Sequence, residues 1–92
     1  MKPYYDIPLD NDNEWYRMFD HTVDSDELVW HRDHKTREIE VEYGHGWGFQ
    51  RDNEMPFDIN THNKFTIEAM VYHRLIKGHT PLVIKIKEQE ND

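Results

Sequence analysis

The most constraining feature of the sequence is an alternation of charged and apolar residues with a period of two. Residues 38–43 (EIEVEY) alternate strictly, and residues 82–87 (LVIKIK) alternate over their last four positions near the end of the chain. Successive side chains of a β-strand point to opposite faces, so this alternation is typical of half-buried strands. Other β-prone segments lie between turn residues, and the expected strands are 15–19, 27–31, 38–43, 47–51, 56–59, 64–67, 71–76 and 82–87. Short strands at a spacing of about 8–12 residues predict an all-β domain, a sandwich or a barrel.

The length and composition limit the chain to one small domain. It has 92 residues, of which 36% are hydrophobic and 33% are charged. We expect an irregular N-terminal arm over residues 1–13, which contain two prolines and a run of Asp and Asn, then a single domain over 14–88 and a frayed tail over 89–92. Because a domain of this size buries only about 60–65% of its unfolded surface, we also expect a homodimer that enlarges the core.

Charge and residue usage argue against several classes of function. The formal net charge is −8, from 19 acidic and 11 basic residues, which argues against a nucleic-acid partner because phosphate contacts require an excess of Lys and Arg. The absence of cysteine excludes disulfides, thiolate metal sites and a cysteine nucleophile. No apolar run approaches the ~20 residues that span a bilayer, and no secretory signal is visible, so we expect no membrane partner and a cytoplasmic location.

Two of the seven histidines, His31 and His73, fall inside expected strands among apolar residues. An imidazole that faces a core requires a hydrogen bond, a carboxylate or a metal ion as its partner. Asp33 shares a strand face with His31, about 6–7 Å away along the chain, and an opposing strand with His73 would complete two histidines and one carboxylate. That set suits non-haem Fe(II) or another divalent ion (Mn, Ni or Zn) with open coordination positions, although H-x-D alone also arises by chance.

Arg37 has the same strand parity as Ile39 and Val41, so it faces the expected core. An inward-facing arginine is costly unless it is paired, and two interpretations follow. Arg37 could form a structural ion pair with Asp33. Alternatively, its planar guanidinium could bind the carboxylate of a small anionic ligand.

The spacing of these residues resembles the first motif of the cupin family, H-x-H-x3-4-E-x6-G. The run His31-x-Asp33-x3-Arg37-x6-Gly44 follows this frame, with Asp33 in place of the second histidine and Arg37 in place of the glutamate. The second motif, G-x5-P-x-G-x2-H-x3-N, falls on residues 62–77 and keeps its metal-binding histidine as His73, whereas its Gly, Pro, Gly and Asn positions hold other residues. The resemblance covers about residues 26–87 and extends to small single-domain cupin-like proteins of unassigned function.

The resemblance implies a jelly-roll β-barrel (a double-stranded β-helix) with an interior pocket. The two histidines and Asp33 would converge there on a metal, and the candidate ligand-binding residues are Arg37, Gln50, Tyr43 and Trp47. One function that fits is the binding of a divalent metal, a small anionic ligand or both. A metal-free binding or interaction module with an Arg37–Asp33 ion pair, and a metal-dependent oxygenase or isomerase of small molecules, are the alternatives. The sequence leaves open whether the chain is an enzyme.

Overall fold

A computed structural model describes residues 2–24 and 28–90 of the chain. Within these residues it contains eight β-strands and no helix, which confirms the predicted all-β class. The strands are β1 (Tyr4–Pro8), β2 (Glu14–Phe19), β3 (Arg37–Tyr43), β4 (Trp47–Arg51), β5 (Phe57–Ile59), β6 (Lys64–Ile67), β7 (His73–Ile76) and β8 (Leu82–Glu88).

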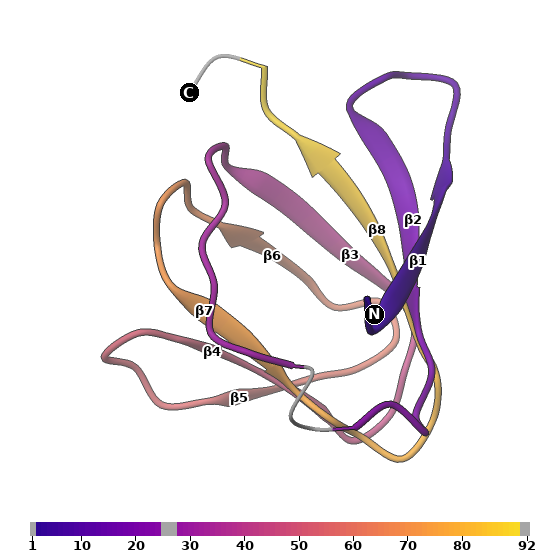
Figure 1. Ribbon diagram of the computed structural model, residues 1–92, viewed down its shortest axis with the longest axis vertical. Coiled ribbons are helices and arrows are strands. Elements are labelled where there is room, and N and C mark those ends of the chain that lie inside the picture. Colours follow the sequence, from indigo (N-terminus) through magenta and orange to yellow (C-terminus); the bar gives the residue numbers. More distant parts are fainter. Residues whose placement is uncertain (1, 25–27, 91–92) are drawn as a thin grey trace.

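The strands form two antiparallel sheets that face each other (Figure 1). One sheet has five strands in the order β1-β2-β8-β3-β6, and the other has three in the order β5-β4-β7. The last strand, β8, therefore lies between β2 and β3 in the middle of the larger sheet. Pairing of strands that are distant in sequence joins both ends of the chain to one core.

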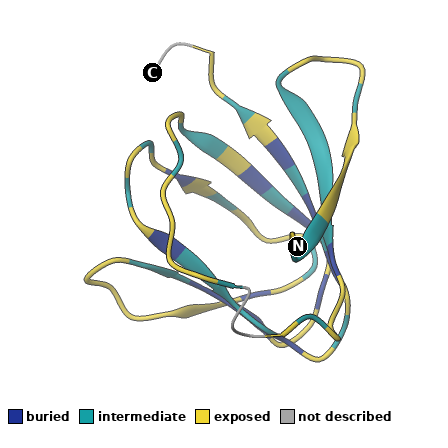
Figure 2. Ribbon diagram, in the orientation of Figure 1, coloured by how far each residue is buried: buried dark blue, intermediate teal, exposed yellow. Residues whose placement is uncertain are grey.

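The period-two alternation seen in the sequence becomes the inner and outer faces of the larger sheet. In the β3–β8 register, Ile39 lies opposite Ile86 and Val41 lies opposite Ile84, and all four side chains are buried. The Glu residues of β3 and the Lys residues of β8 alternate with them and point outward, so Figure 2 shows buried and more exposed segments in turn along both strands. Each fully buried isoleucine stabilises the fold by about 1.5–3 kcal/mol.

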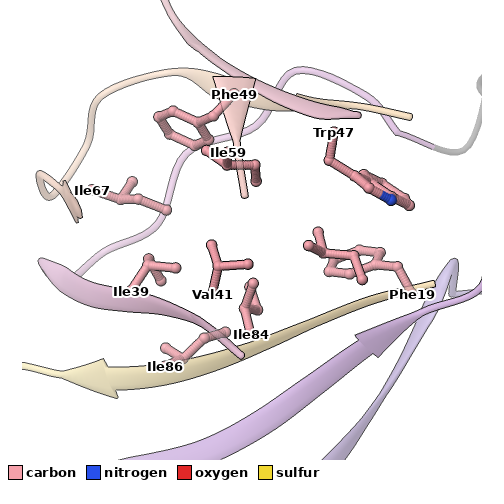
Figure 3. Packing of buried hydrophobic residues seen from close by; sticks show 10 residues of the cluster. Phe19, Ile39, Val41, Trp47, Phe49, Ile59, Ile67, Ile84 and Ile86 are labelled. Carbon is pink, nitrogen blue, oxygen red and sulfur yellow. The ribbon is translucent and has the colours of Figure 1, made fainter. Parts of the chain in front are cut away.

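The smaller sheet supplies the opposite wall of the core. Trp47, Phe49 and Ile59 are each at most 1% exposed and lie opposite buried residues of the larger sheet, with Trp47 over Phe19 (Figure 3). Trp47 also donates a hydrogen bond from Nε1 to the carbonyl of Thr80, 2.7 Å away. Gly78 approaches Trp47 so closely that a Cβ at this position would collide with the indole and its backbone, which explains why a glycine stands there.

Two parts of the chain differ from the expected strands. The arm expected to be irregular contains β1, which pairs with β2 from Tyr4 opposite Phe19 to Pro8 opposite Trp15. The strand expected over 27–31 begins at residue 27, which lies outside the described residues, and the remainder forms only a single bridge at His31. Residues 1–13 show no lasting period from which to identify β1, because Asp6 and Pro8 lie within the strand and a run of Asp and Asn follows it.

The strand registers place charged residues at one end of the space between the sheets. Arg37 begins β3 and lies opposite Ile67 and Glu88, which end β6 and β8, whereas His73 begins β7 opposite Arg51 at the end of β4. At the other end Phe19 packs against Trp47 with ring centroids 5.9 Å apart. Figure 1 shows the two sheets converging at one end and spreading apart at the other.

Candidate metal centre

His31 and His73 meet as a hydrogen-bonded antiparallel pair. The His31 amide donates to the His73 carbonyl at 3.0 Å, and the His73 amide donates to the His31 carbonyl at 2.9 Å. Their imidazole rings lie edge to face with centroids 4.4 Å apart. His73 is 3% exposed, whereas His31 is exposed. The two histidines that the sequence placed in expected strands are thus side by side, one inside the fold and one at its surface.

Backbone carbonyls determine which ring nitrogen carries the hydrogen in both histidines. Nδ1 of His73 lies 2.9 Å from the carbonyl oxygen of Val71, and Nδ1 of His31 lies 3.0 Å from that of Val29. A carbonyl oxygen only accepts, so each Nδ1 must carry the proton. In the neutral rings Nε2 then keeps its lone pair, which is the arrangement found when a carbonyl orients a metal-binding histidine.

Asp33 presents a second acceptor to the same place. Its Oδ2 lies 3.4 Å from Nε2 of His73, is buried, and has no hydrogen-bond partner among the described residues. One ligand atom each from His31, Asp33 and His73 lies within 4.8 Å of the other two. A buried carboxylate oxygen beside a lone pair is unfavourable unless a cation or a proton joins them.

A proton on His73 is disfavoured at this position. Burial lowers the pKa of the His73 imidazole, and it outweighs the hydrogen bond to Val71 and the negative charge of Asp33, which both raise the pKa. The neighbouring His31 and Arg37 lower it further. A neutral ring with a free Nε2 beside a buried carboxylate oxygen fits a divalent cation, and two imidazoles with one carboxylate are a suitable donor set for it.

Arg37 lies beside the cluster and has two carboxylate partners. Its Nη1 is 3.4 Å from Oδ1 of Asp33, and its Nε donates to Oε2 of Glu88 at 3.1 Å. Its guanidinium also lies over the ring of Trp15, 5.3 Å from the centroid. The ion pair between Arg37 and Asp33 considered from the sequence is therefore present, with Glu88 as an additional partner.

The three other candidate ligand-binding residues lie away from this cluster. Trp47 is fully buried near the opposite end of β4. Tyr43 is 46% exposed and packs against His45, because a register shift between Val41 and Tyr43 turns it to the outer face. Gln50 bonds the guanidinium of Arg74 and the backbone of Glu54.

A cavity of about 630 Å³ adjoins the cluster and extends between the sheets. His31, Asp33, Arg37 and His73 line it, whereas Tyr43, Trp47 and Gln50 are not among its described lining residues. Arg17, which lines the cavity, and Glu88, which binds Arg37, were not predicted from the sequence. Strand parity could have found both, because Arg17 alternates in step with Phe19, and Glu88 with Ile86.

Comparison with known proteins identifies the fold. At the level of sequence, no protein family and no curated protein matches the chain. Among solved structures, a suggested mannose-6-phosphate isomerase from Ralstonia eutropha JMP134 is similar with a TM-score of 0.70 and 14% identity, over 95% of this chain and 82% of that one. A cupin-2 domain protein from Shewanella frigidimarina (TM-score 0.68, 14% identity, 94% and 79%) and a cupin domain from Bordetella pertussis (0.60, 9%, 97% and 96%) are also similar.

The chain therefore has the fold of a small single-domain cupin, a jelly-roll β-barrel of two antiparallel sheets. This confirms the fold class that the resemblance of the two degenerate motifs implied. Identities of 9–14% establish the architecture alone, because one fold supports many unrelated functions. In the part of the chain that the structure describes, no helix is long and apolar enough to cross a membrane.

Proposed function

We propose that this cupin binds one divalent metal ion through His31, Asp33 and His73 and receives a small molecule in the adjoining cavity. The observation that carries the proposal is the buried Oδ2 of Asp33, which faces Nε2 of His73 at 3.4 Å without a hydrogen-bond donor among the described residues. Both rings hold Nδ1–H against a carbonyl, so their Nε2 atoms are free to ligate.

The donor set indicates which ions to test. Two imidazoles and one carboxylate suit Fe(II), Mn(II), Ni(II) and Zn(II), and a three-residue set leaves further positions for water or a small molecule. A bound ion of this kind supplies Lewis-acid chemistry or, for iron, a site for oxygen chemistry. This chain's own contribution is to orient the two rings and to keep one carboxylate oxygen of Asp33 unpaired.

A metal-free module is the second candidate, and the Arg37–Asp33 ion pair favours it. Arg37 places a positive charge 3.4 Å from Oδ1 of Asp33. In a pocket without a metal ion, this charge would balance the carboxylate. The same contact, however, engages Oδ1 and leaves Oδ2 without a partner among the described residues. A guanidinium that binds the other oxygen is also what would orient a ligating carboxylate. We therefore favour metal binding.

Two reactions are candidates for catalysis at this site. The fold similarity to a suggested mannose-6-phosphate isomerase makes isomerisation one reaction to test, and a two-histidine, one-carboxylate set makes oxygenation another. Turnover by the metal-loaded protein, absent in a His73→Ala variant, would support an enzyme.

Metal binding is tested directly by titration of protein purified without a histidine tag. Calorimetry with Mn²⁺, Ni²⁺ and Zn²⁺, and elemental analysis after dialysis, should give one equivalent per chain. His73→Ala and Asp33→Ala should each weaken binding by tenfold or more. His34→Ala is the matched control, because His34 is an exposed neighbour outside the cluster and should leave the affinity unchanged.

Two results would refute the proposal. One is a lack of stoichiometric binding by the wild-type protein, and the other is equal loss in the control and in His73→Ala. In the first case, the metal-free module would become the better description.

A further inference from the structure

The cavity beside the metal centre is lined mainly by hydrocarbon. Of the 19 described residues that line it, five are isoleucines and three are phenylalanines. Both sheets contribute, for instance Ile84 from the larger and Leu75 from the smaller. The volume of about 630 Å³ is typical of a small-molecule site. Such a lining binds a ligand chiefly by removing apolar surface from water.

The arginines that line the cavity are already paired. Arg17 donates hydrogen bonds from Nε and Nη2 to the carboxylate of Asp6, at 2.8 and 3.0 Å. Arg37 forms ion pairs with Glu88 and Asp33. Recognition of a phosphate dianion relies on guanidinium or ammonium groups directed at it. Lys2 is the remaining cationic residue among the described lining residues. The cavity is therefore poorly suited to a doubly charged phosphate ester.

The lining is also poor in the groups that recognise sugars. Among the described lining residues there is no Ser, Thr, Asn or Gln. A polyhydroxylated ligand would lose hydrogen bonds to water there without regaining them, which is costly. The polar side chains of the described lining are those of the metal-centre cluster, the paired arginines, Lys2 and the hydroxyl of Tyr4.

From these three observations we propose that the cavity binds an amphipathic monocarboxylate. Its apolar chain or ring occupies the space between the sheets, and its carboxylate lies toward His31, Asp33 and His73. A carboxylate is an oxygen donor that a divalent ion accepts, so the head-group assignment rests on the metal binding proposed above. The assignment of the apolar body rests on the lining alone and is independent of the metal.

The independence of these two parts decides the design of the experiment. Straight-chain 1-alkanols and alkanoates of four to ten carbons are titrated into the metal-free and the Mn²⁺-loaded protein, and binding is measured by calorimetry or thermal shift. The alkanols probe the apolar body without charge. The alkanoates add the head group, which Asp33 should repel when no metal is bound. Mn²⁺ binding is measured separately, without any organic ligand.

We expect the affinity for alkanols and for alkanoates to rise about two- to fourfold for each added methylene until the cavity is filled. For the alkanols this rise should be the same in the metal-free and the Mn²⁺-loaded protein. With Mn²⁺ bound, an alkanoate should bind at least tenfold tighter than the alkanol of equal length. An affinity independent of chain length would overturn the apolar site, even if Mn²⁺ binds. A chain-length dependence without the gain from Mn²⁺ would overturn the head-group assignment. Tighter binding of a hexose 6-phosphate than of octanoate would overturn the whole inference.

A blocking variant localises the site. Leu75→Trp adds bulk to a half-buried residue that lines the cavity and should reduce the affinity for octanol by tenfold or more. Val83→Trp is the matched control, because Val83 is equally half-buried but points to the outer face of β8. Equal effects of the two variants would refute this location. If Leu75→Trp does not fold, the chain-length series in the wild-type protein still decides.

Discussion

Replacing Arg37 with methionine removes a positive charge from between two carboxylates while keeping most of the aliphatic bulk. The side chains of Arg37, Asp33 and Glu88 are 16%, 12% and 25% exposed, so water compensates the loss only in part. Without Arg37, Asp33 and Glu88 stand near each other with unbalanced negative charge. The variant should therefore be less stable than the wild-type protein at neutral pH.

The magnitude follows from the contacts that Arg37 makes. The hydrogen bond from Nε to Glu88, at 3.1 Å, joins two charged groups, and such bonds contribute about 1.5–3 kcal/mol. The longer contact with Asp33 and the position over the Trp15 ring each add about 0.5–1 kcal/mol. Together these contacts predict a loss of about 3 kcal/mol in the free energy of unfolding. In a domain of this size such a loss lowers Tm by about 12–24 °C.

Urea denaturation of the metal-free protein measures the loss, and Arg74→Met is the matched control. Arg74 donates to the neutral amide oxygen of Gln50 at 3.0 Å and lies over Trp30, so its replacement leaves no carboxylate unpaired and should cost less than that of Arg37. A loss below about 0.5 kcal/mol for Arg37→Met, within the range of ordinary surface substitutions, would refute the network. So would equal losses for the two arginine variants.

Three further predictions concern pH, metal and assembly. Burial lowers the pKa of His73 below 6.5, so His73 of the unfolded chain takes up a proton first as the pH falls. The free energy of unfolding should therefore decrease as the pH falls below 6.5, by at most about 1.4 kcal/mol per pH unit. Urea denaturation of the metal-free His73→Gln variant should lack this pH dependence. A hundredfold excess of Zn²⁺ over its Kd should stabilise the wild-type protein by ~2.7 kcal/mol, an increase in Tm that a chelator reverses and His73→Ala lacks. Light scattering should detect the expected homodimer, and Ile7→Lys should weaken it if the exposed edge strand β1 forms the interface; a monomer at all concentrations would refute the dimer.

The alternation of apolar and polar residues was the sequence pattern that best predicted which face of each strand is buried. The alternation in 38–43 and 82–87 correctly predicted that Ile39, Val41, Ile84 and Ile86 form the inner face of a sheet. The same rule oriented Arg37 inward, where it meets a carboxylate. This success has a physical reason, because a shift of one residue would expose every apolar side chain of the strand, so the pattern strongly specifies which face is buried.

Two candidate ligand-binding residues, Gln50 and Tyr43, lie outside the described lining of the cavity, for different reasons. Gln50 stands one position from Phe49, so strand parity already assigns them to opposite faces. Tyr43 has the parity of Val41, but the register shift between them turns Tyr43 to the face of Val83. A bulge inserts one residue locally and leaves no clear mark in the hydrophobic pattern, so the exposure of Tyr43 was not predictable from that pattern.

The two departures from the cupin motif compensate each other in the structure. When the sequence is compared with the cupin motif position by position, Asp33 and Arg37 each replace a usual metal ligand. By that comparison, only two of the four usual ligand positions would keep their histidines. In space, Arg37 binds Oδ1 of Asp33 at 3.4 Å while Oδ2 remains directed at His73. Glu88 balances the charge of Arg37 from the end of β8, far along the chain from either motif. A carboxylate oriented by a fixed guanidinium is a more rigid donor than an isolated one. For the metal binding proposed above, the substitutions thus leave Asp33 as a candidate ligand with Arg37 as its support, beside His31 and His73.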